Sequence, residues 1–391
     1  MINQSLVGAV LEARKAKAVT AVYGARHGVA GMLSCDFIDL GKESAATLRA
    51  LAATPSAGLG SVRKKPTPEE CGAIFDVFRK YNVRFFFYIG GNDSAETAHL
   101  INEMGKEHGY ELRAFHIPKT IDNDLLATDH CPGFGSAAKF VAQAFMGDDL
   151  DNRSIPGVKI NVVMGRHAGF LTAASILGRR RPDDGPHLVY VPERPFDVDQ
   201  FVADVKAVYQ RLGRCVVAVS EGIHDAQGEP ILHKFAKSDE VDSHGNIQLS
   251  GTGALGDVLA QVVKARLGAE IKKLRVRADT FGYLQRCFPG VVSEVDAKEA
   301  FEVGRMAVRF ALSGNTDGSV AIRRKKGPKY AVEYFLARLS DVAKESTGLP
   351  DGFINAEGNG ITPAFVKYAL PLVGKLPVIA WLKGSRVAKK A

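Results

Sequence analysis

The stretch of residues 84–94 constrains the possible folds of this chain more than any other. Its apolar and aromatic residues, 85–89, do not alternate with polar ones, which predicts a strand buried on both faces, as in a parallel sheet. Gly90 and Gly91 follow directly, and residues 95–101 are typical of a helix start. At such a junction, free backbone N–H groups and the helix dipole favour the binding of an anion. An ordinary strand–helix turn is the alternative.

A second polar cluster follows the short apolar run of residues 115–117. Segment 118–124, Pro-Lys-Thr-Ile-Asp-Asn-Asp, holds an ammonium group, a hydroxyl, an amide and the carboxylates of Asp122 and Asp124. An ammonium group beside carboxylates at a strand end suits the binding of phosphate and metal, and the removal of a proton from a hydroxyl. The alternative is a polar turn with an Asx cap.

Segment 90–94, Gly-Gly-Asn-Asp-Ser, together with segment 118–124 resembles the phosphofructokinase family, and three later segments agree with it. The resemblance runs along nearly the whole chain and implies an α/β fold with two three-layer α/β/α domains and mainly parallel sheets. Residues 1–133 plus about 285–340 would form a domain for the phosphoryl donor and magnesium. Residues 134–284 plus about 341–391 would form a sugar-phosphate domain.

The resemblance also implies the reaction, which is transfer of a phosphoryl group to the 1-hydroxyl of fructose 6-phosphate with Mg2+ as cofactor. Asp122 would accept the hydroxyl proton, and Arg63 would stabilise charge on the transferring group. Asn92 is the expected metal-binding residue, although many members have aspartate there and an amide oxygen is a poorer magnesium ligand than a carboxylate. The expected donor-binding residues are Gly90, Gly91, Asp93, Ser94 and Lys119.

The sugar phosphate is expected to bind at the other family segments. Residues 275–286 place three arginines and a tyrosine around a glycine, and charge-assisted hydrogen bonds from such a set bind a phosphate well. The expected substrate-binding residues are Thr120, Ile121, Asp122, Asp124, Met164, Gly165, Arg166, Glu221, Arg277, Tyr283 and Arg286. His167 is interpreted as a packed side chain. Many members lend an arginine to the neighbouring subunit where Gly157 stands here, and Lys159 is a candidate substitute.

Two residues favour pyrophosphate over ATP as the donor. Members that use ATP generally have glycine where Asp93 and Lys119 stand, whereas the pyrophosphate-using group has aspartate and lysine. A carboxylate where the α-phosphate of a nucleotide would lie repels it. At about 4 Å and an effective dielectric constant near 20, this repulsion is on the order of 4 kcal/mol, or about three decades of affinity. We therefore predict a reversible pyrophosphate-dependent 6-phosphofructokinase, with an ATP-dependent enzyme and an inactive homologue as alternatives.

The beginning of the chain departs from the family pattern. Residues 3–17 are predicted to form a helix with Asn3 as its N-cap, and residues 19–23 a strand. Family members have a strand and a glycine-rich, donor-contacting loop before the segment that resembles residues 2–5. We expect the reading frame to begin upstream; a fragment or impaired donor binding are the alternatives.

Composition limits the partners and the location. The net charge of +8 is assigned to anionic substrates, here fructose 6-phosphate and pyrophosphate, because basic residues are not interleaved with aromatic ones as in a nucleic-acid binder. The sequence contains no run of eighteen or more apolar residues, so it predicts no membrane span. The scattered cysteines favour a reduced cytoplasm. The family implies a homodimer or higher homo-oligomer. The Gly-x-Gly-x-x-Gly pattern at 251–256 is interpreted as a false dinucleotide fingerprint.

Overall fold

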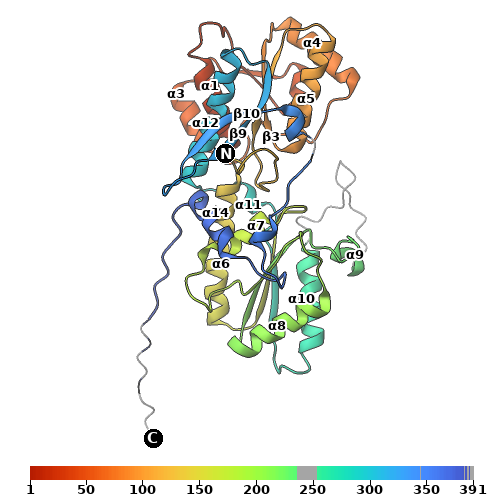
Figure 1. Ribbon diagram of the computed structural model, residues 1–391, viewed down its shortest axis with the longest axis vertical. Helices are drawn as coiled ribbons and strands as arrows, with labels where there is room; N and C mark the ends of the chain where they lie inside the picture. Colours follow the sequence, from red (N-terminus) through yellow and green to blue (C-terminus); the bar gives the residue numbers. More distant parts are fainter. Residues whose placement is uncertain (236–252, 344, 383, 385–386, 388–391) are drawn as a thin grey trace.

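The computed structural model describes residues 1–235, 253–343, 345–382, 384 and 387. Two α/β halves are stacked along the long axis of the molecule (Figure 1). The strands are β1 Tyr23–Ala25, β2 Phe37–Asp39, β3 Phe85–Gly90, β4 Arg113–Pro118, β5 Val158–Val163, β6 Leu188–Tyr190, β7 Cys215–Ser220, β8 Val276–Thr280, β9 Asp317–Arg324 and β10 Val332–Ala337. The helices of eight or more residues are α1 Ile2–Ala13, α3 Ala45–Ala53, α4 Pro68–Lys80, α5 Asn92–Glu107, α6 Phe134–Ser154, α8 Val198–Leu212, α10 Ala254–Leu267, α12 Glu294–Leu312 and α14 Pro363–Val373. Shorter helical turns are α2 Val29–Ser34, α7 Phe170–Ala173, η1 Ala174–Gly178, α9 Ile231–Phe235, α11 Leu284–Cys287, α13 Leu339–Val342 and η2 Asp351–Phe353.

The first sheet has the strand order β10-β9-β4-β3, with β9, β4 and β3 parallel and β10 antiparallel to β9. Successive side chains of a strand point to opposite faces. Phe115 and Ile117 therefore pack in the cluster formed with α1 and α12, and Phe86 and Ala114 in the cluster formed with α4 and α5. Both faces of the sheet are covered, as residues 85–89 predicted.

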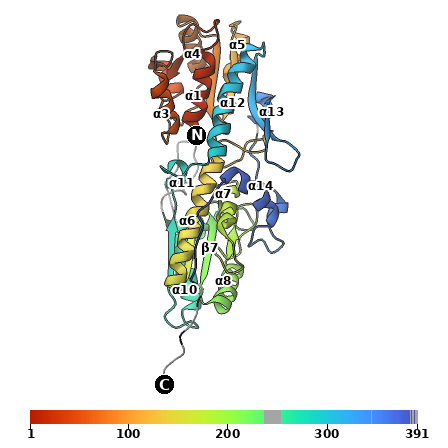
Figure 2. The same cartoon turned by 90° about the vertical axis from the view of Figure 1, so that its left-hand side faces the viewer.

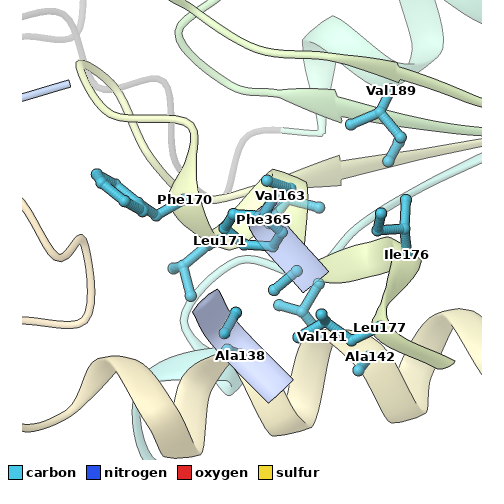
Figure 3. Close-up of a cluster of buried hydrophobic side chains, with 14 of the residues drawn as sticks. Ala138, Val141, Ala142, Val163, Phe170, Leu171, Ile176, Leu177, Val189 and Phe365 are labelled. Atoms are coloured by element: carbon cyan, nitrogen blue, oxygen red, sulfur yellow. The ribbon is translucent and has the colours of Figure 1, made fainter. Parts of the chain in front are cut away.

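The second sheet is parallel throughout, in the order β6-β7-β5-β8. Ile160 and Val217 pack with α8 and α10 on one face, whereas Val163 and Ala218 pack with α6 and α14 on the other. Figure 3 shows this second cluster, in which Phe365 of α14 lies among side chains of α6 and β5. The predicted pair of three-layer α/β/α units with mainly parallel sheets is thus confirmed.

The elements near the N-terminus differ from the prediction. The strand expected at 19–23 begins only at Tyr23, and Asn3 lies within α1, which has no side-chain cap. The Asn3 amide is used elsewhere: its Nδ2 donates to the Thr54 carbonyl (2.9 Å), and its Oδ1 accepts from the Gly58 backbone N–H (2.8 Å). Tertiary contacts therefore override the local capping preference.

The described residues exclude the first two positions of the Gly-x-Gly-x-x-Gly pattern, 251 and 252, and all of residues 245–250 before it. Its last glycine, Gly256, lies in α10, where a Cβ atom would meet Ala278 of β8 at 3.1 Å and Val162 of β5 at 3.3 Å. This glycine allows close packing of α10 against the second sheet, which is also the role of the third glycine in a genuine fingerprint, so the interpretation of the pattern as false stays a prediction.

Close contact between α1 and α12 depends on glycine (Figure 2). A Cβ atom on Gly304 of α12 would lie 2.0 Å from the Ser5 carbonyl oxygen of α1. Because the two backbones must separate to admit a methyl group, Gly304→Ala is expected to lower the free energy of unfolding by about 1–3 kcal/mol in urea denaturation. Gly72→Ala in α4 is the control, since its Cβ meets nothing within 4 Å. Equal stabilities of the two variants would contradict the prediction.

Candidate active site

A cleft of about 880 Å³ lies between the two halves. The segments that follow β3, β4 and β5 contribute to its walls, together with the end of β7 and residues 283–292. Ligand sites of parallel α/β sheets form at the carboxyl ends of strands in this way. Residues at the N-termini of α1 and α5 also line the cleft, so two helix dipoles direct their positive ends toward it. The cleft is therefore suited to anionic ligands.

Most residues predicted from the sequence come together here. Those that line the cleft are Arg63, Gly90, Gly91, Asn92, Asp93, Ser94, Lys119, Thr120, Ile121, Asp122, Asp124, Met164, Arg166, Glu221, Tyr283 and Arg286. Gly165 lies between two lining residues, with its carbonyl accepting a hydrogen bond from the buried Ser220 hydroxyl (2.5 Å). Arg277 is not brought into the cleft: it is exposed on the edge strand β8, where its guanidinium donates to the Val276 carbonyl (3.0 Å).

Asp122 has the environment of a proton acceptor. Its backbone N–H donates to the Thr120 hydroxyl (3.2 Å), and its Oδ1 is buried without a hydrogen-bond partner among the described residues. Burial raises the pKa of Asp122 to about 7; the carboxylates of Asp124 and Glu221 add to the rise, and Lys119 and Arg286 oppose it. A carboxyl group with a pKa near neutrality accepts a proton and releases it again efficiently at the pH of a cell.

The pKa of Lys119 is shifted in the opposite direction to that of Asp122. Burial lowers its pKa, the nearby Arg286 guanidinium lowers it further, and Asp122 opposes both effects. The cleft thus brings two cationic side chains next to a carboxyl group that is readily protonated. Such a set can bind a multiply charged phosphate compound while leaving one oxygen able to take up a proton.

Asn92 begins α5 and holds Asp124 in place. Its Nδ2 donates to Asp124 Oδ2 (2.9 Å) and to the Ser346 hydroxyl (2.8 Å). Its Oδ1 is buried and has no hydrogen-bond partner in the part of the chain that the structure describes. An orphaned carbonyl oxygen beside a carboxylate can serve as a ligand of a hard cation. Within the described ranges, however, no group of three or more His, Cys, Asp or Glu side chains is arranged to hold a metal ion.

Sequence reasoning missed Ser346 and Lys65. Lys65 Nζ lies 3.2 Å from Asp93 Oδ1 and 2.6 Å from Glu96 Oε2, so the loop after Arg63 is tied to the first turns of α5. No local signal reveals either pairing. The contact also changes the expectation for Asp93, because a neighbouring ammonium group neutralises part of the charge that was expected to repel a nucleotide.

His116 is a further missed residue, and here a signal existed, since it is a histidine inside an apolar strand. It is fully buried in β4, and burial lowers its pKa to about 4, so the imidazole is neutral. Because the Gly90 carbonyl can only accept, His116 Nε2–H donates to it (2.9 Å), and Nδ1 accepts from the Ser319 hydroxyl (2.8 Å). This bridge from β4 to β3 and β9 fixes the backbone at the glycine turn.

Two weaker expectations had different outcomes. His167 is not a packed side chain: it is exposed and lines the cleft. Lys159, considered as a substitute for the arginine lent to a neighbouring subunit, forms ion pairs within its own chain with Asp279 and with Asp148 (3.4 Å). Its charge is therefore already compensated inside the second half.

Comparisons with known proteins agree with this geometry. The profile described as Phosphofructokinase matches residues 2–311. The chain is 56% identical over 390 residues to the pyrophosphate–fructose 6-phosphate 1-phosphotransferase of Rhodospirillum rubrum, covering 100% of this chain and 95% of that protein. It is 39% identical over 409 residues to the Xanthomonas campestris protein of the same name, with the same coverage. The crystal structure of the pyrophosphate-dependent phosphofructokinase of Marinobacter aquaeolei superposes with a TM-score of 0.84 at 33% identity, covering 100% of this chain and 95% of that one. The chain belongs to the phosphofructokinase family.

Proposed function

We propose that this chain transfers a phosphoryl group reversibly from pyrophosphate to the 1-hydroxyl of fructose 6-phosphate, giving fructose 1,6-bisphosphate and phosphate. The observation that carries the proposal is the presence in one cleft of Asp93 and Lys119 beside the proton acceptor Asp122. The names of the relatives from R. rubrum and X. campestris support the same donor and acceptor. An acid and a lysine at these positions favour a bare diphosphate over a nucleotide.

In the proposed mechanism, the oxygen of the sugar 1-hydroxyl attacks the phosphorus that is transferred, and Asp122 accepts the proton of that hydroxyl. The bridging P–O bond of pyrophosphate breaks, and phosphate leaves with negative charge that Lys119 offsets. Arg63 stabilises the negative charge on the phosphoryl group in the transition state, which is the usual role of an arginine in phosphoryl transfer. Arg166, Glu221, Tyr283 and Arg286 would bind the sugar phosphate from the second half, and Met164 and Ile121 would shape its site.

Magnesium fits the residues on the donor side. Magnesium is usually held by one or two carboxylates together with phosphate oxygens and water. Asp124 and the orphaned Oδ1 of Asn92 would hold the ion, with the donor supplying other ligands. When bound, the ion would neutralise charge on the pyrophosphate oxygens.

Two alternatives have specific observations in their favour. The Lys65–Asp93 ion pair lowers the repulsion that a nucleotide would meet, which favours some use of ATP. The amide at Asn92 in place of a carboxylate favours an inactive homologue. Against inactivity, the cleft holds Arg63, Asp122, Arg166 and Glu221 together.

A two-donor assay tests the proposal. The purified chain is incubated with fructose 6-phosphate and Mg2+ plus either pyrophosphate or ATP, and fructose 1,6-bisphosphate is measured. We expect turnover with pyrophosphate, formation of pyrophosphate in the reverse direction from phosphate, and at least about a hundredfold lower kcat/KM with ATP, since a few kcal/mol of repulsion corresponds to such a ratio. Equal or faster turnover with ATP would contradict the donor assignment, and no turnover with either would favour the inactive homologue.

The remaining expectations belong to the same proposal. A homodimer or larger assembly is supported by Arg277, which lies outside its own cleft on an exposed edge strand; light scattering tests it. Location in the cytoplasm is supported by five cysteines that form no disulfide. No helix in the described residues has the length and apolar character needed to cross a bilayer. The boundaries between donor and sugar-phosphate domains near residues 134, 285 and 341 stay predictions.

A further inference from the structure

Asn123 lies between the two carboxylates of the cleft segment and is itself buried. Its backbone has φ 61°, the left-handed region that asparagine tolerates better than most residues. Both ends of its amide are used: Oδ1 accepts from the Cys131 backbone N–H (2.8 Å), and Nδ2 donates to the Tyr368 hydroxyl (2.8 Å). The turn that presents Asp122 and Asp124 is therefore fixed by the two hydrogen bonds of its central residue, Asn123.

Tyr368 reaches this turn from the opposite half of the molecule. It lies on α14, which packs on the second sheet, and its hydroxyl donates to the Asp129 carbonyl (2.8 Å) while accepting from Asn123. The Arg324 guanidinium at the end of β9 lies 4.8 Å from the Tyr368 ring centroid, and Arg324 also donates to the Tyr368 carbonyl (2.9 Å). The tyrosine is thus fixed by both halves.

A buried ionic group makes this connection stiff. His130 places Nδ1 2.8 Å from Asp129 Oδ1 and Nε2 2.7 Å from Glu299 Oε2, and Glu299 Oε1 accepts from the Tyr330 hydroxyl (2.6 Å). Although burial opposes it, the bonds to Asp129 and Glu299 raise the pKa of His130, so both ring nitrogens can donate. Asp129 also accepts from Arg324 (3.0 Å). Movement of the 123–131 segment would break several charge-assisted hydrogen bonds together.

We propose that Tyr368 is a positioning residue for phosphoryl transfer: through the Asn123 amide, its hydroxyl holds Asp122 and Asp124 at the geometry that the reaction needs. The inference rests on the proposed function, in which Asp122 accepts the proton of the sugar hydroxyl. It gives the C-terminal helix a role in the chemistry, although Tyr368 does not line the cleft. A displacement of about 1 Å at reacting groups is enough to cost up to a hundredfold in rate.

The test compares two tyrosine-to-phenylalanine variants. Tyr368→Phe is expected to lower kcat with pyrophosphate about tenfold, while KM for each substrate changes less than twofold, because the cleft walls that bind substrate stay intact. The control is Tyr190→Phe, a buried tyrosine of β6 whose hydroxyl donates to Asp204 (2.8 Å). It also loses one hydrogen bond, but its kcat should not change.

A second variant keeps the proposal testable if Tyr368→Phe folds poorly. Asn123→Gly retains the left-handed backbone and removes the amide, and it should reproduce the tenfold loss of kcat. The double variant should lose little more than Asn123→Gly alone, because both changes break the same Asn123–Tyr368 hydrogen bond and Asn123→Gly also removes the acceptor of the Cys131 N–H. Tyr368→Phe with wild-type kcat, or an equal fall of kcat in Tyr190→Phe, would overturn the inference. A wild-type chain inactive with pyrophosphate would instead overturn the proposed function.

Discussion

Asp122→Asn is expected to lower kcat with pyrophosphate by about a hundredfold to ten-thousandfold, because a positioned proton acceptor contributes this much to a transfer from a hydroxyl. The variant is isosteric, so KM for both substrates should change little. In the wild type, only the carboxylate form accepts the proton, and its pKa is raised to about 7. The rate should therefore fall as the pH drops below about 7, whereas the residual rate of Asp122→Asn should lack this limb.

Stability measurements separate this loss from misfolding. The pKa of Asp122 is higher in the folded protein than in the unfolded chain, so its charge opposes folding once the pH exceeds the unfolded value. The free energy of unfolding of Asp122→Asn at pH 8 should therefore be no lower than that of the wild type. Asp76→Asn serves as the matched control, since Asp76 is exposed on α4 and pairs with Arg79 (2.8 Å). Asp122→Asn with wild-type kcat would remove Asp122 from the mechanism.

The parts of the site that could be predicted are local in sequence. Residues 85–89 form strand β3 because their continuous apolar run favours burial on both faces, and residues 95–101, predicted as a helix start, lie within α5. Polar side chains directly after such strands then meet at one edge of each sheet. The cleft follows from these rules and from the resemblance of a few short segments to a known family.

The parts that escaped prediction depend on contacts between distant segments. Asn92 and Ser346 are separated by 254 positions, and Asn123 and Tyr368 by 245. Nothing in either local sequence indicates such a partner, because packing of the two halves decides it. Local preference predicts Asn3 as a helix N-cap. In the structure its side-chain amide instead donates to the Thr54 carbonyl and accepts from the Gly58 backbone N–H. Arg277 follows the family pattern but lies on an exposed edge, where sequence spacing could not place it.

Replacing both Asp93 and Lys119 with glycine is expected to change the phosphoryl donor. Without Lys119, the leaving phosphate loses its nearby cation, and kcat with pyrophosphate should fall about a hundredfold to a thousandfold. Without Asp93, a nucleotide no longer meets the carboxylate expected beside its α-phosphate, and kcat/KM with ATP should rise. If the full repulsion, on the order of 4 kcal/mol, were removed, kcat/KM with ATP would rise about a thousandfold. Because Lys65 lies 3.2 Å from Asp93, we expect a smaller gain, between about tenfold and a thousandfold.

Three further variants divide the effect between charges. Asp93→Asn removes the charge at nearly constant volume and should raise ATP use without abolishing turnover of pyrophosphate. Lys119→Gly alone should lower pyrophosphate turnover and leave ATP use low. Lys65→Met removes the neutralising partner, so Asp93 should exclude ATP more strongly than in the wild type. If the double variant keeps full pyrophosphate turnover and still fails to use ATP, Asp93 and Lys119 do not set the donor, and the preference must come from the shape of the cleft around α5.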